Sequence, residues 1–202
     1  MSSNLHRRVL QQSGFAAGEI GLPPRGPTSS RNLNSKRSRD YSALSWVKYF
    51  SYRSVIETNE GKNNFVVYTR ESQKIANAEM EKSKVPVILL LHGGGFSALT
   101  WSLLVANITT RVNCRAVAVD LRGHGDTVTD DDDDLSAESM AADVVDVIQG
   151  VAGSTDTLVP PPVVLVGHSM GGAVAVHAAL TNRIENLAGL CVIDVVEGKF
   201  NQ

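Results

Sequence analysis

The sequence is poor in the features that mark several classes of protein. It has two cysteines in 202 residues, a formal net charge of only −2, and no apolar run longer than residues 85–91. Two cysteines are too few for a disulfide framework, and the small net charge gives no reason to expect nucleic acid as a partner. The apolar run is far too short to cross a bilayer. We therefore expect neither a nucleic-acid partner nor a membrane partner.

The amino-terminal segment also lacks the apolar stretch of a secretory signal. Both cysteines, Cys114 and Cys191, lie inside apolar runs typical of strands, which predicts buried free thiols in a reducing compartment. We expect a cytoplasmic or nuclear protein, or one found in both places. The basic residues Lys36, Arg37 and Arg39 fit either a nuclear address or a solvated tail.

Regular structure is not expected in residues 1–40, which are rich in Ser, Asn, Gly, Pro and Arg. Apolar residues are too few there to offset the entropy of ordering the chain, so we predict a mobile tail. Residues 41–202 have the texture of a globular domain, since the whole chain is 43% hydrophobic and 20% charged. Aromatic residues between positions 46 and 50 should pack on that domain.

Apolar strands alternate with helical patterns along the domain. This order predicts an α/β fold with a mainly parallel, doubly wound sheet. Several of the strands are continuously apolar, as expected when both faces of a sheet are covered. The expected strands are residues 64–70, 85–91, 114–120, 163–166 and 187–193, and the expected helices are residues 99–112, 136–148 and 170–180.

The loop of residues 121–135 contains five consecutive aspartates, at positions 130–134. We expect these to form a solvated loop tip, because contiguous like charges lack the geometry of a metal site. Ser136 follows as a helix N-cap, with Glu138 in the first turn. The next connection is expected at residues 150–162, which end in three prolines.

Residues 167–171 read Gly-His-Ser-Met-Gly, the G-x-S-x-G pattern of a nucleophile elbow. A predicted strand precedes the pattern and a small-residue helix follows it, which is the context such an elbow needs. The abrupt turn holds Ser169 in a strained backbone conformation that exposes its hydroxyl, and the flanking glycines keep Cβ atoms out of the crowded turn. Ser169 is therefore the predicted nucleophile.

A second glycine-rich turn, His-Gly-Gly-Gly at residues 92–95, follows an earlier strand. Taken alone, it is equally well explained as a tight turn. Upstream of an elbow, it predicts an oxyanion hole, in which the amide of Gly94 or Gly95 acts together with the amide of Met170.

Asp194 follows the last predicted strand, at the carboxyl end where catalytic groups of such sheets collect. It can orient an imidazole, although a residue that only caps a turn fits the spacing equally well. Glu197 is a weaker competitor for the role. No metal and no cofactor is needed for this chemistry.

The histidines all precede Asp194 in the chain: His6, His92, His124, His168 and His177. The elbow sends the side chain of His168 in a different direction from that of its neighbour. His92 belongs to the glycine-rich turn and His124 to a loop, while we expect His177 to be a satisfied structural residue inside a packed helix. His6 lies in the predicted tail. The sequence therefore supplies no convincing general base.

Several stretches between about residues 39 and 198 resemble the protein phosphatase methylesterases. These α/β-hydrolases remove the methyl ester from the C-terminal leucine of the type 2A phosphatase catalytic subunit. The resemblance implies that this subunit is the partner, that the reaction needs no cofactor, and that Asp194 is the catalytic aspartate. The matching stretches are residues 39–41 with Trp46 and residues 49–50, residues 91–95 with 97–99 and Trp101, residues 120–122 with 124–125, residues 135–138, residues 167–172 and residues 191–198.

The same resemblance implies a C-terminally truncated domain, because the family places a cap region, further strands and the triad histidine after the position of Gly198. Four hypotheses follow. The chain is a carboxyl methylesterase, another esterase or lipase of this fold, an inactive form that binds the phosphatase, or a fragment without function. We also expect an unpaired apolar edge at residues 187–193.

Overall fold

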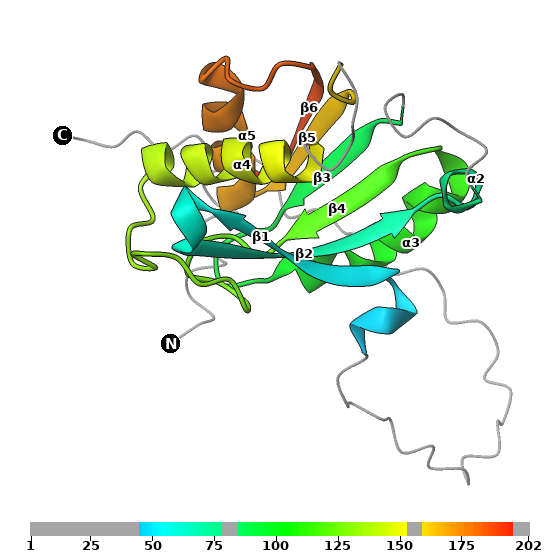
Figure 1. Ribbon diagram of the computed structural model, residues 1–202, viewed down its shortest axis with the longest axis horizontal. Coiled ribbons are helices and arrows are strands. Elements are labelled where there is room, and N and C mark those ends of the chain that lie inside the picture. The colour runs from blue at the N-terminus through cyan, green and yellow to red at the C-terminus, as the bar shows by residue number, and fades with distance from the viewer. Residues whose placement is uncertain (1–44, 78–84, 153–158, 196–202) are drawn as a thin grey trace, which may run out of the picture. The chain divides into compact units, whose positions relative to one another are not determined.

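The computed structural model describes residues 45–77, 85–152 and 159–195 (Figure 1). The predicted tail of residues 1–40, its basic cluster and Glu197 lie outside this part of the chain. Within the described part, no helix is long and apolar enough to cross a membrane.

One mixed sheet organises the described residues, with strand order β1-β2-β4-β3-β5-β6. Strands β1 and β2 form an antiparallel hairpin, and β2 pairs antiparallel with β4. The pairs β4–β3, β3–β5 and β5–β6 are parallel, which confirms the predicted mainly parallel sheet. The strands are Tyr52–Thr58 (β1), Asn63–Glu71 (β2), Val87–Leu91 (β3), Arg115–Val119 (β4), Val163–His168 (β5) and Leu187–Ile193 (β6).

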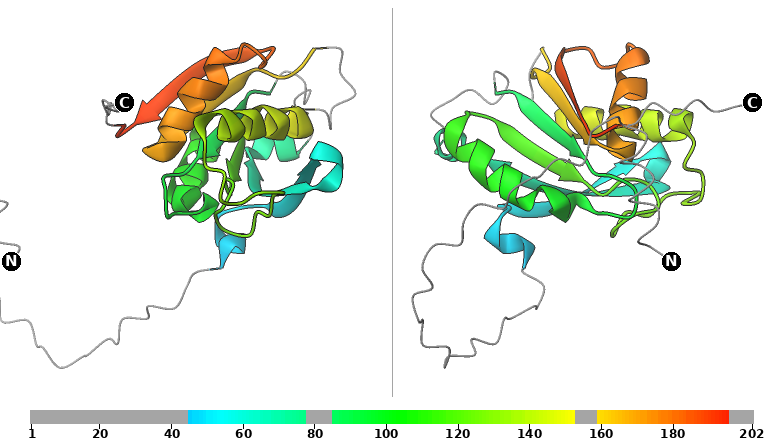
Figure 2. Two further views of the ribbon diagram at one scale, coloured as in Figure 1. Left: turned by 90° about the vertical axis from the view of Figure 1, so that its left-hand side faces the viewer. Right: turned by 180° about the vertical axis from the view of Figure 1, so that it is seen from behind.

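Helices cover the two faces of the sheet unequally (Figures 1 and 2). Helix α4 packs against β1 and α5, and α5 packs against β3, β5 and β6, so together they cover one face. Helix α3 and the short helix η4 cover β2 and β4 on the other. The helices are Trp46–Lys48 (η1), Asn59–Gly61 (η2), Gln73–Ala76 (α2), Ala98–Trp101 (η4), Ser102–Arg111 (α3), Ala137–Ala152 (α4) and Met170–Leu180 (α5).

Two hydrophobic cores lie on the two faces. The first joins alternate residues of the sheet, such as Leu89 and Leu165, to the apolar side of α4 and α5. The second lies under α3 and η1. The aromatic segment packs here as predicted: Phe50 is buried, and the ring of Trp46 lies 5.9 Å from that of Tyr68 in an edge-on arrangement.

Strand β1 was not predicted. Its sequence, Tyr-Arg-Ser-Val-Ile-Glu-Thr, is mostly polar, and most of its residues are exposed. Because β1 lies at the edge of the sheet, only Ile56 and Thr58 are partly buried, and its apolar periodicity is too weak to reveal it. Its register comes from backbone pairing with β2 instead.

Residues 187–193 form the predicted strand, but the expectation that this strand is buried was wrong. Strand β6 lies at the other edge of the sheet, and Leu190, Val192 and Ile193 are each at least 40% exposed. Cys114 is a buried free thiol, as expected, but Cys191 is exposed because it lies on this edge strand. The unpaired apolar edge itself was predicted correctly for the described residues.

Helix α4 begins where predicted and ends later. The Ser136 hydroxyl accepts a hydrogen bond from the Ser139 amide at 3.3 Å, as expected of an N-cap. The helix then continues through Gly150 to Ala152, although the connection was predicted to start at residue 150. A Cβ on Gly150 would lie 2.4 Å from Cγ2 of Ile56, so the glycine lets α4 approach β1 closely.

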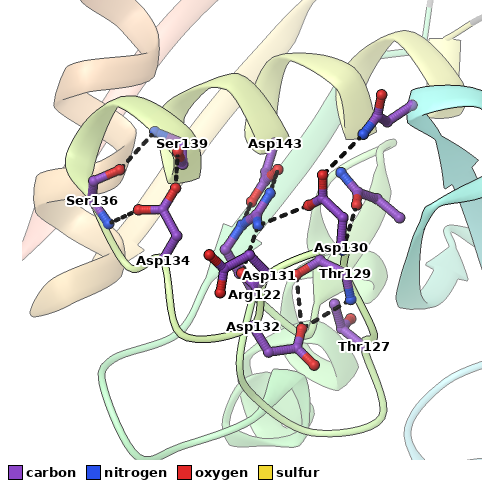
Figure 3. A network of polar contacts seen from close by, with 12 residues as sticks. Arg122, Thr127, Thr129, Asp130, Asp131, Asp132, Asp134, Ser136, Ser139 and Asp143 are labelled. Atoms are coloured by element: carbon purple, nitrogen blue, oxygen red, sulfur yellow. Dashed lines mark hydrogen bonds and ion pairs between the residues drawn. The ribbon is translucent and has the colours of Figure 1, made fainter.

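The aspartate run is an ordered loop around Arg122 (Figure 3). The buried guanidinium group of Arg122 donates to both carboxylate oxygens of Asp143, at 2.7 and 2.8 Å, and to the carbonyl of Asp131 at 2.8 Å. These carboxylate bonds, with that to Asp130, raise the pKa of Arg122 and keep it charged. Most aspartate side chains in the run are exposed, as expected, but the loop is not a free tip because Arg122 holds its backbone.

Candidate active site

The parallel strands bring the predicted site residues to one edge of the sheet. Strands β3, β5 and β6 are neighbours and run in the same direction, so their carboxyl ends lie together. The glycine-rich turn follows β3, Ser169 follows β5 and Asp194 follows β6. Residues separated by up to about a hundred positions in the chain therefore meet as the sequence predicted.

Ser169 occupies a strained position at the end of β5. Its φ is 51° and its ψ is −120°, a region that non-glycine residues rarely adopt, and its side chain is exposed. The surrounding backbone leaves no room for side chains. A Cβ on Gly167 would lie 2.2 Å from the Gly171 carbonyl oxygen, and one on Gly171 would lie 2.4 Å from the His92 carbonyl oxygen. The sharp turn thus depends on both glycines of the elbow.

The glycine-rich turn lies directly against this elbow. A Cβ on Gly93 would lie 3.3 Å from the Cβ of Ser169, and one on Gly94 would lie 3.6 Å from Sδ of Met170. Met170 is the first residue of α5, so its amide has no acceptor one turn earlier within the helix. Among the described residues the Gly94 amide also has no hydrogen-bond acceptor. Both amides are therefore available to an oxyanion.

The Gly95 amide is engaged elsewhere. It donates a hydrogen bond to Nε2 of His124 at 3.1 Å, while Nδ1 of His124 lies 2.8 Å from the Arg122 carbonyl oxygen. This pattern assigns the proton of the neutral imidazole to Nδ1. Of the two amides that the sequence offered for the oxyanion hole, Gly94 fits the structure better than Gly95.

His92 is fully buried and structural. Its Nδ1 lies 2.8 Å from the Gly93 carbonyl oxygen, and its Nε2 accepts the Leu121 amide at 3.0 Å. Burial is the largest influence on this ring and lowers its pKa, and the neighbouring His124 acts in the same direction. A neutral ring with both nitrogens bonded links the turn after β3 to the loop after β4, and it is not free to act as a base.

Asp194 lies beside His168, not beside a downstream histidine. Oδ2 of Asp194 is 4.0 Å from Nε2 of His168, and the aspartate side chain is 82% exposed. Asp194 has a φ of 52°, so both predicted catalytic residues hold positive φ values. The Ser169 amide donates to the Ile193 carbonyl at 2.9 Å, which ties the elbow to the end of β6.

The described histidines do not supply an evident base for Ser169. Nδ1 of His168 is buried without a hydrogen-bond partner in the described part of the chain, and the approach of its ring to Asp194 was not anticipated. The expectation for His177 was wrong. It is exposed, because Val174, Ala175 and Ala178 form the buried side of α5.

Two supporting residues were missed as parts of the site. His124 bonds the Gly95 amide, and the buried carboxylate of Asp120 accepts the Ala98 amide at 2.7 Å and the Asp126 amide at 3.2 Å. Only their position in the sequence could have indicated this role. Asp120 and His124 follow β4, which pairs in parallel with β3, so they lie at the same edge of the sheet as the glycine-rich turn. No group of three acidic, histidine or cysteine side chains suited to a metal occurs among the described residues.

Comparison with known proteins decides the family. A model described as "Alpha/beta hydrolase family" matches residues 88–199, more than half of the sequence. The chain belongs to the alpha/beta hydrolase family. The match includes the glycine-rich turn, the elbow and Asp194, which are the segments that the sheet brings to one edge.

The resemblance to protein phosphatase methylesterases is also confirmed. The chain is 47% identical over 182 residues to protein phosphatase methylesterase 1 of Bos taurus, covering 88% of this chain and 44% of that protein. It is 38% identical over 179 residues to a probable protein phosphatase methylesterase 1 of Caenorhabditis elegans, with the same coverage of each chain. The chain therefore spans less than half the length of these relatives.

Solved structures support the fold. Epoxide hydrolase I of potato (Solanum tuberosum) is similar with a TM-score of 0.57 and 24% identity, over 74% of this chain and 41% of that one. A putative lipase of Acinetobacter baumannii has a TM-score of 0.57 and 20% identity, over 80% and 50% of the two chains. At these identities the likeness concerns the fold alone.

Proposed function

We propose that this chain carries the nucleophile part of a serine carboxylic-ester hydrolase. Its substrate would be the methyl ester on the C-terminal leucine of the type 2A protein phosphatase catalytic subunit. The observation that carries the proposal is the strained, exposed Ser169 beside the available amides of Gly94 and Met170. The similarity to protein phosphatase methylesterases supports the substrate class.

The proposed reaction passes through an acyl-enzyme. Oγ of Ser169 attacks the ester carbonyl carbon while a general base takes its proton, and the Gly94 and Met170 amides stabilise the oxyanion. The tetrahedral intermediate expels methoxide, which takes the proton from the base and leaves as methanol. Water then attacks the acyl-enzyme, releasing the free carboxylate and restoring Ser169. Asp194 would orient the base, an imidazole that the family resemblance places after this sequence.

A second candidate is a binding form without catalytic activity. It is favoured by the surroundings of Asp194, whose side chain is 82% exposed and has the His168 imidazole only at 4.0 Å. Such a form would bind the phosphatase, or compete with the complete enzyme, in a manner independent of the Ser169 hydroxyl. A cytoplasmic or nuclear location remains part of the proposal.

The first test compares the 202-residue chain with its Ser169→Ala variant. Both are treated with a fluorophosphonate probe and with a phosphatase subunit carrying the methyl ester, and phosphatase binding is measured in parallel. For an active hydrolase we expect labelling and methanol release that the variant loses completely. A panel of simple acyl esters separates a methylesterase from a lipase or general esterase.

The outcomes separate the two candidates. Phosphatase binding that is equal in both proteins, without labelling or methanol release, would favour the binding form and reject activity of this chain. Absence of both binding and labelling, from protein that melts cooperatively, would reject both candidates.

A further inference from the structure

We propose that a pocket formed by the end of β2, helix α2 and the end of α3 binds a small organic phosphate. The pocket lies at the edge of the sheet opposite the candidate active site, because Glu71 in its lining pairs with Arg115, the first residue of β4. The active-site residues instead follow the carboxyl ends of the parallel strands. This second site does not rest on the proposed hydrolase function.

Separate segments of the chain enclose this pocket. Val47 lies on η1, Ala76 on α2 and Thr109 on α3, and all three contribute to its lining. Helices α2 and α3 lie next to each other at this end of the sheet (Figure 1). The pocket has a volume of about 800 Å³. Pockets that bind small molecules have volumes of roughly 300–1,000 Å³, so the space suits a small ligand.

The lining of the pocket carries a net positive charge. Arg70 and Lys74 contribute the two cations, and Glu71 contributes the single carboxylate among the described lining residues. That carboxylate is already paired, because Nε of Arg115 lies 2.8 Å from Oε1 of Glu71 and both side chains are largely buried. The charges of Arg70 and Lys74 therefore remain to attract an anion.

The aspartate-rich loop is too distant to cancel this charge. The Asp130 amide donates to the side chain of Asn63 at 2.9 Å, which places the loop at the start of β2, whereas the pocket lies at the end of β2. Strand β2 has 9 residues, so its ends lie roughly 25–30 Å apart. Exposed charges are largely screened beyond about 10 Å at 0.1 M salt. The acidic and basic ends of the strand thus act independently.

Arg70 is held in place with most of its donors unused. Its Nη1 donates to the Tyr49 carbonyl at 2.9 Å, which is its one hydrogen bond within the part of the chain that the structure describes. A guanidinium group has further N–H groups in a fixed planar arrangement. Such a group can donate to two oxygens of one phosphate, so the anchored Arg70 is suited to phosphate recognition.

The hydroxyl of Ser72 is a buried donor without a partner. Ser72 lines the pocket and is 3% exposed, and its Oγ has no hydrogen-bond partner among the described residues. Its backbone is satisfied, because its amide donates to the Cys114 carbonyl and its carbonyl accepts the Ile75 amide, both at 3.1 Å. The side chain does not cap α2. Buried hydroxyl groups nearly always have a partner, so this one indicates an acceptor bound in the pocket.

These groups favour a phosphate monoester over a carboxylate. Arg70, Lys74 and Ser72 provide a guanidinium, an ammonium and a hydroxyl donor, and a phosphate monoester offers three acceptor oxygens and nearly two negative charges at neutral pH. A carboxylate has two oxygens and one charge. Val47 and Phe50 add an apolar part to the lining, which suits an organic group attached to the phosphate.

The test is an NMR titration of the full 202-residue chain with phenyl phosphate. We expect saturable shifts of the Ser72 and Lys74 amide signals, with a dissociation constant of about 1 mM or lower. The amide signals of Gly94 and Met170 should not move, which separates this site from the candidate active site. Benzoate should bind about ten-fold more weakly, because it has one charge and two oxygens. Benzyl alcohol, which carries no charge, should cause no saturable shift.

Variants separate the roles of the three donors. Ser72→Ala should weaken phenyl phosphate binding about ten-fold, and it should not lower the melting temperature because it breaks no hydrogen bond in the free protein. Arg70→Lys keeps the charge but loses the paired donors, so it should also weaken binding about ten-fold. Lys74→Ala should weaken binding about three-fold. Its matched control is Lys62→Ala, which removes an exposed lysine beside the other end of β2 and should leave binding unchanged.

Four outcomes would overturn the proposal. Absence of saturable shifts at Ser72 and Lys74 up to about 10 mM phenyl phosphate would exclude the site. Equal affinity for benzoate would exclude recognition of the phosphate, and equal weakening by Lys62→Ala and Lys74→Ala would indicate attraction by the overall charge alone. Unchanged binding by a folded Ser72→Ala variant would show that the buried hydroxyl takes no part. None of these readouts requires hydrolysis, so they stay distinct from the test of the proposed function.

Discussion

At the residue scale, the site depends on backbone positions that tolerate little change. Ser169 and Asp194 hold positive φ values, and a hydrogen bond joins the Ser169 amide to the residue before Asp194. Gly125 is a further example, at a φ of 58° beside the buried Asp120 carboxylate. Since Asp120 bonds the Ala98 and Asp126 amides, crowding at Gly125 would disturb the loops that border the site.

We predict that Gly125→Ala lowers the free energy of unfolding by about 2–4 kcal/mol, combining the left-handed backbone penalty with overpacking. The added Cβ would lie 2.2 Å from Cγ of Asp120. Gly61 is the matched control, because its φ is 82° and no atom lies within 4 Å of an added Cβ. Gly61→Ala should lose only about 1–2 kcal/mol. Urea unfolding measures both, and equal losses would show that the contact with Asp120 is unimportant.

At the scale of elements, α4 is positioned by both its ends. The Ser136 cap and the Arg122–Asp143 ion pair hold its amino-terminal half to the loop after β4 (Figure 3). Gly150 brings its carboxyl end close to Ile56 on β1. A glycine inside a helix normally lowers stability relative to alanine, so its presence here indicates a packing requirement.

The close approach of Gly150 to Ile56 predicts that the effect of Gly150→Ala on the free energy of unfolding changes sign when Ile56 is truncated to alanine. Gly150→Ala alone should destabilise the fold by about 1–3 kcal/mol, because an added Cβ would lie 2.4 Å from Cγ2 of Ile56. In an Ile56→Ala background that methyl group is absent, and the same change should be neutral or stabilise by up to about 1 kcal/mol. A double-mutant cycle of unfolding free energies measures the coupling. Additive effects would contradict the proposed contact.

At the scale of the whole molecule, the burial of Cys114 makes the free energy of unfolding depend on pH in the alkaline range. Burial raises the pKa of the Cys114 thiol from its ordinary value of 9.0 to about 11. Between these values the unfolded chain has released the proton while the folded protein retains it. The unfolded state then binds fewer protons, so stability must fall as pH rises from 9 to 11.

We predict that Cys114 contributes a loss of up to about 1.4 kcal/mol per pH unit in this window. The comparison is with Cys114→Ala, which retains Cys191 and every other titrating group. The free energy of unfolding of the original chain should fall more steeply than that of the variant, and the two curves should run parallel below pH 9. Identical slopes throughout would show that the thiol ionises equally easily in the folded state.

The sequence by itself determined the alternation of strands and helices, the elbow at Ser169, the turn at residues 92–95 and the cap at Ser136. These features depend on short-range sterics and on apolar periodicity, which are properties of neighbouring residues. Parallel pairing then requires the strand ends to meet, so the approach of Ser169 and Asp194 to one edge was also foreseeable.

Only the tertiary structure decided that β1 forms the other edge of the sheet, that the side chains of β6 are exposed and that Cys191 is accessible. It likewise decided that Gly95 bonds His124, that His168 lies beside Asp194, and that Arg122 organises the aspartate loop. The deciding partners are brought close by the fold: His124 for Gly95, Asp194 for His168, and Asp143 on α4 for Arg122. Local pattern specifies what a segment can form, whereas burial and hydrogen bonding depend on neighbours that only the fold brings together.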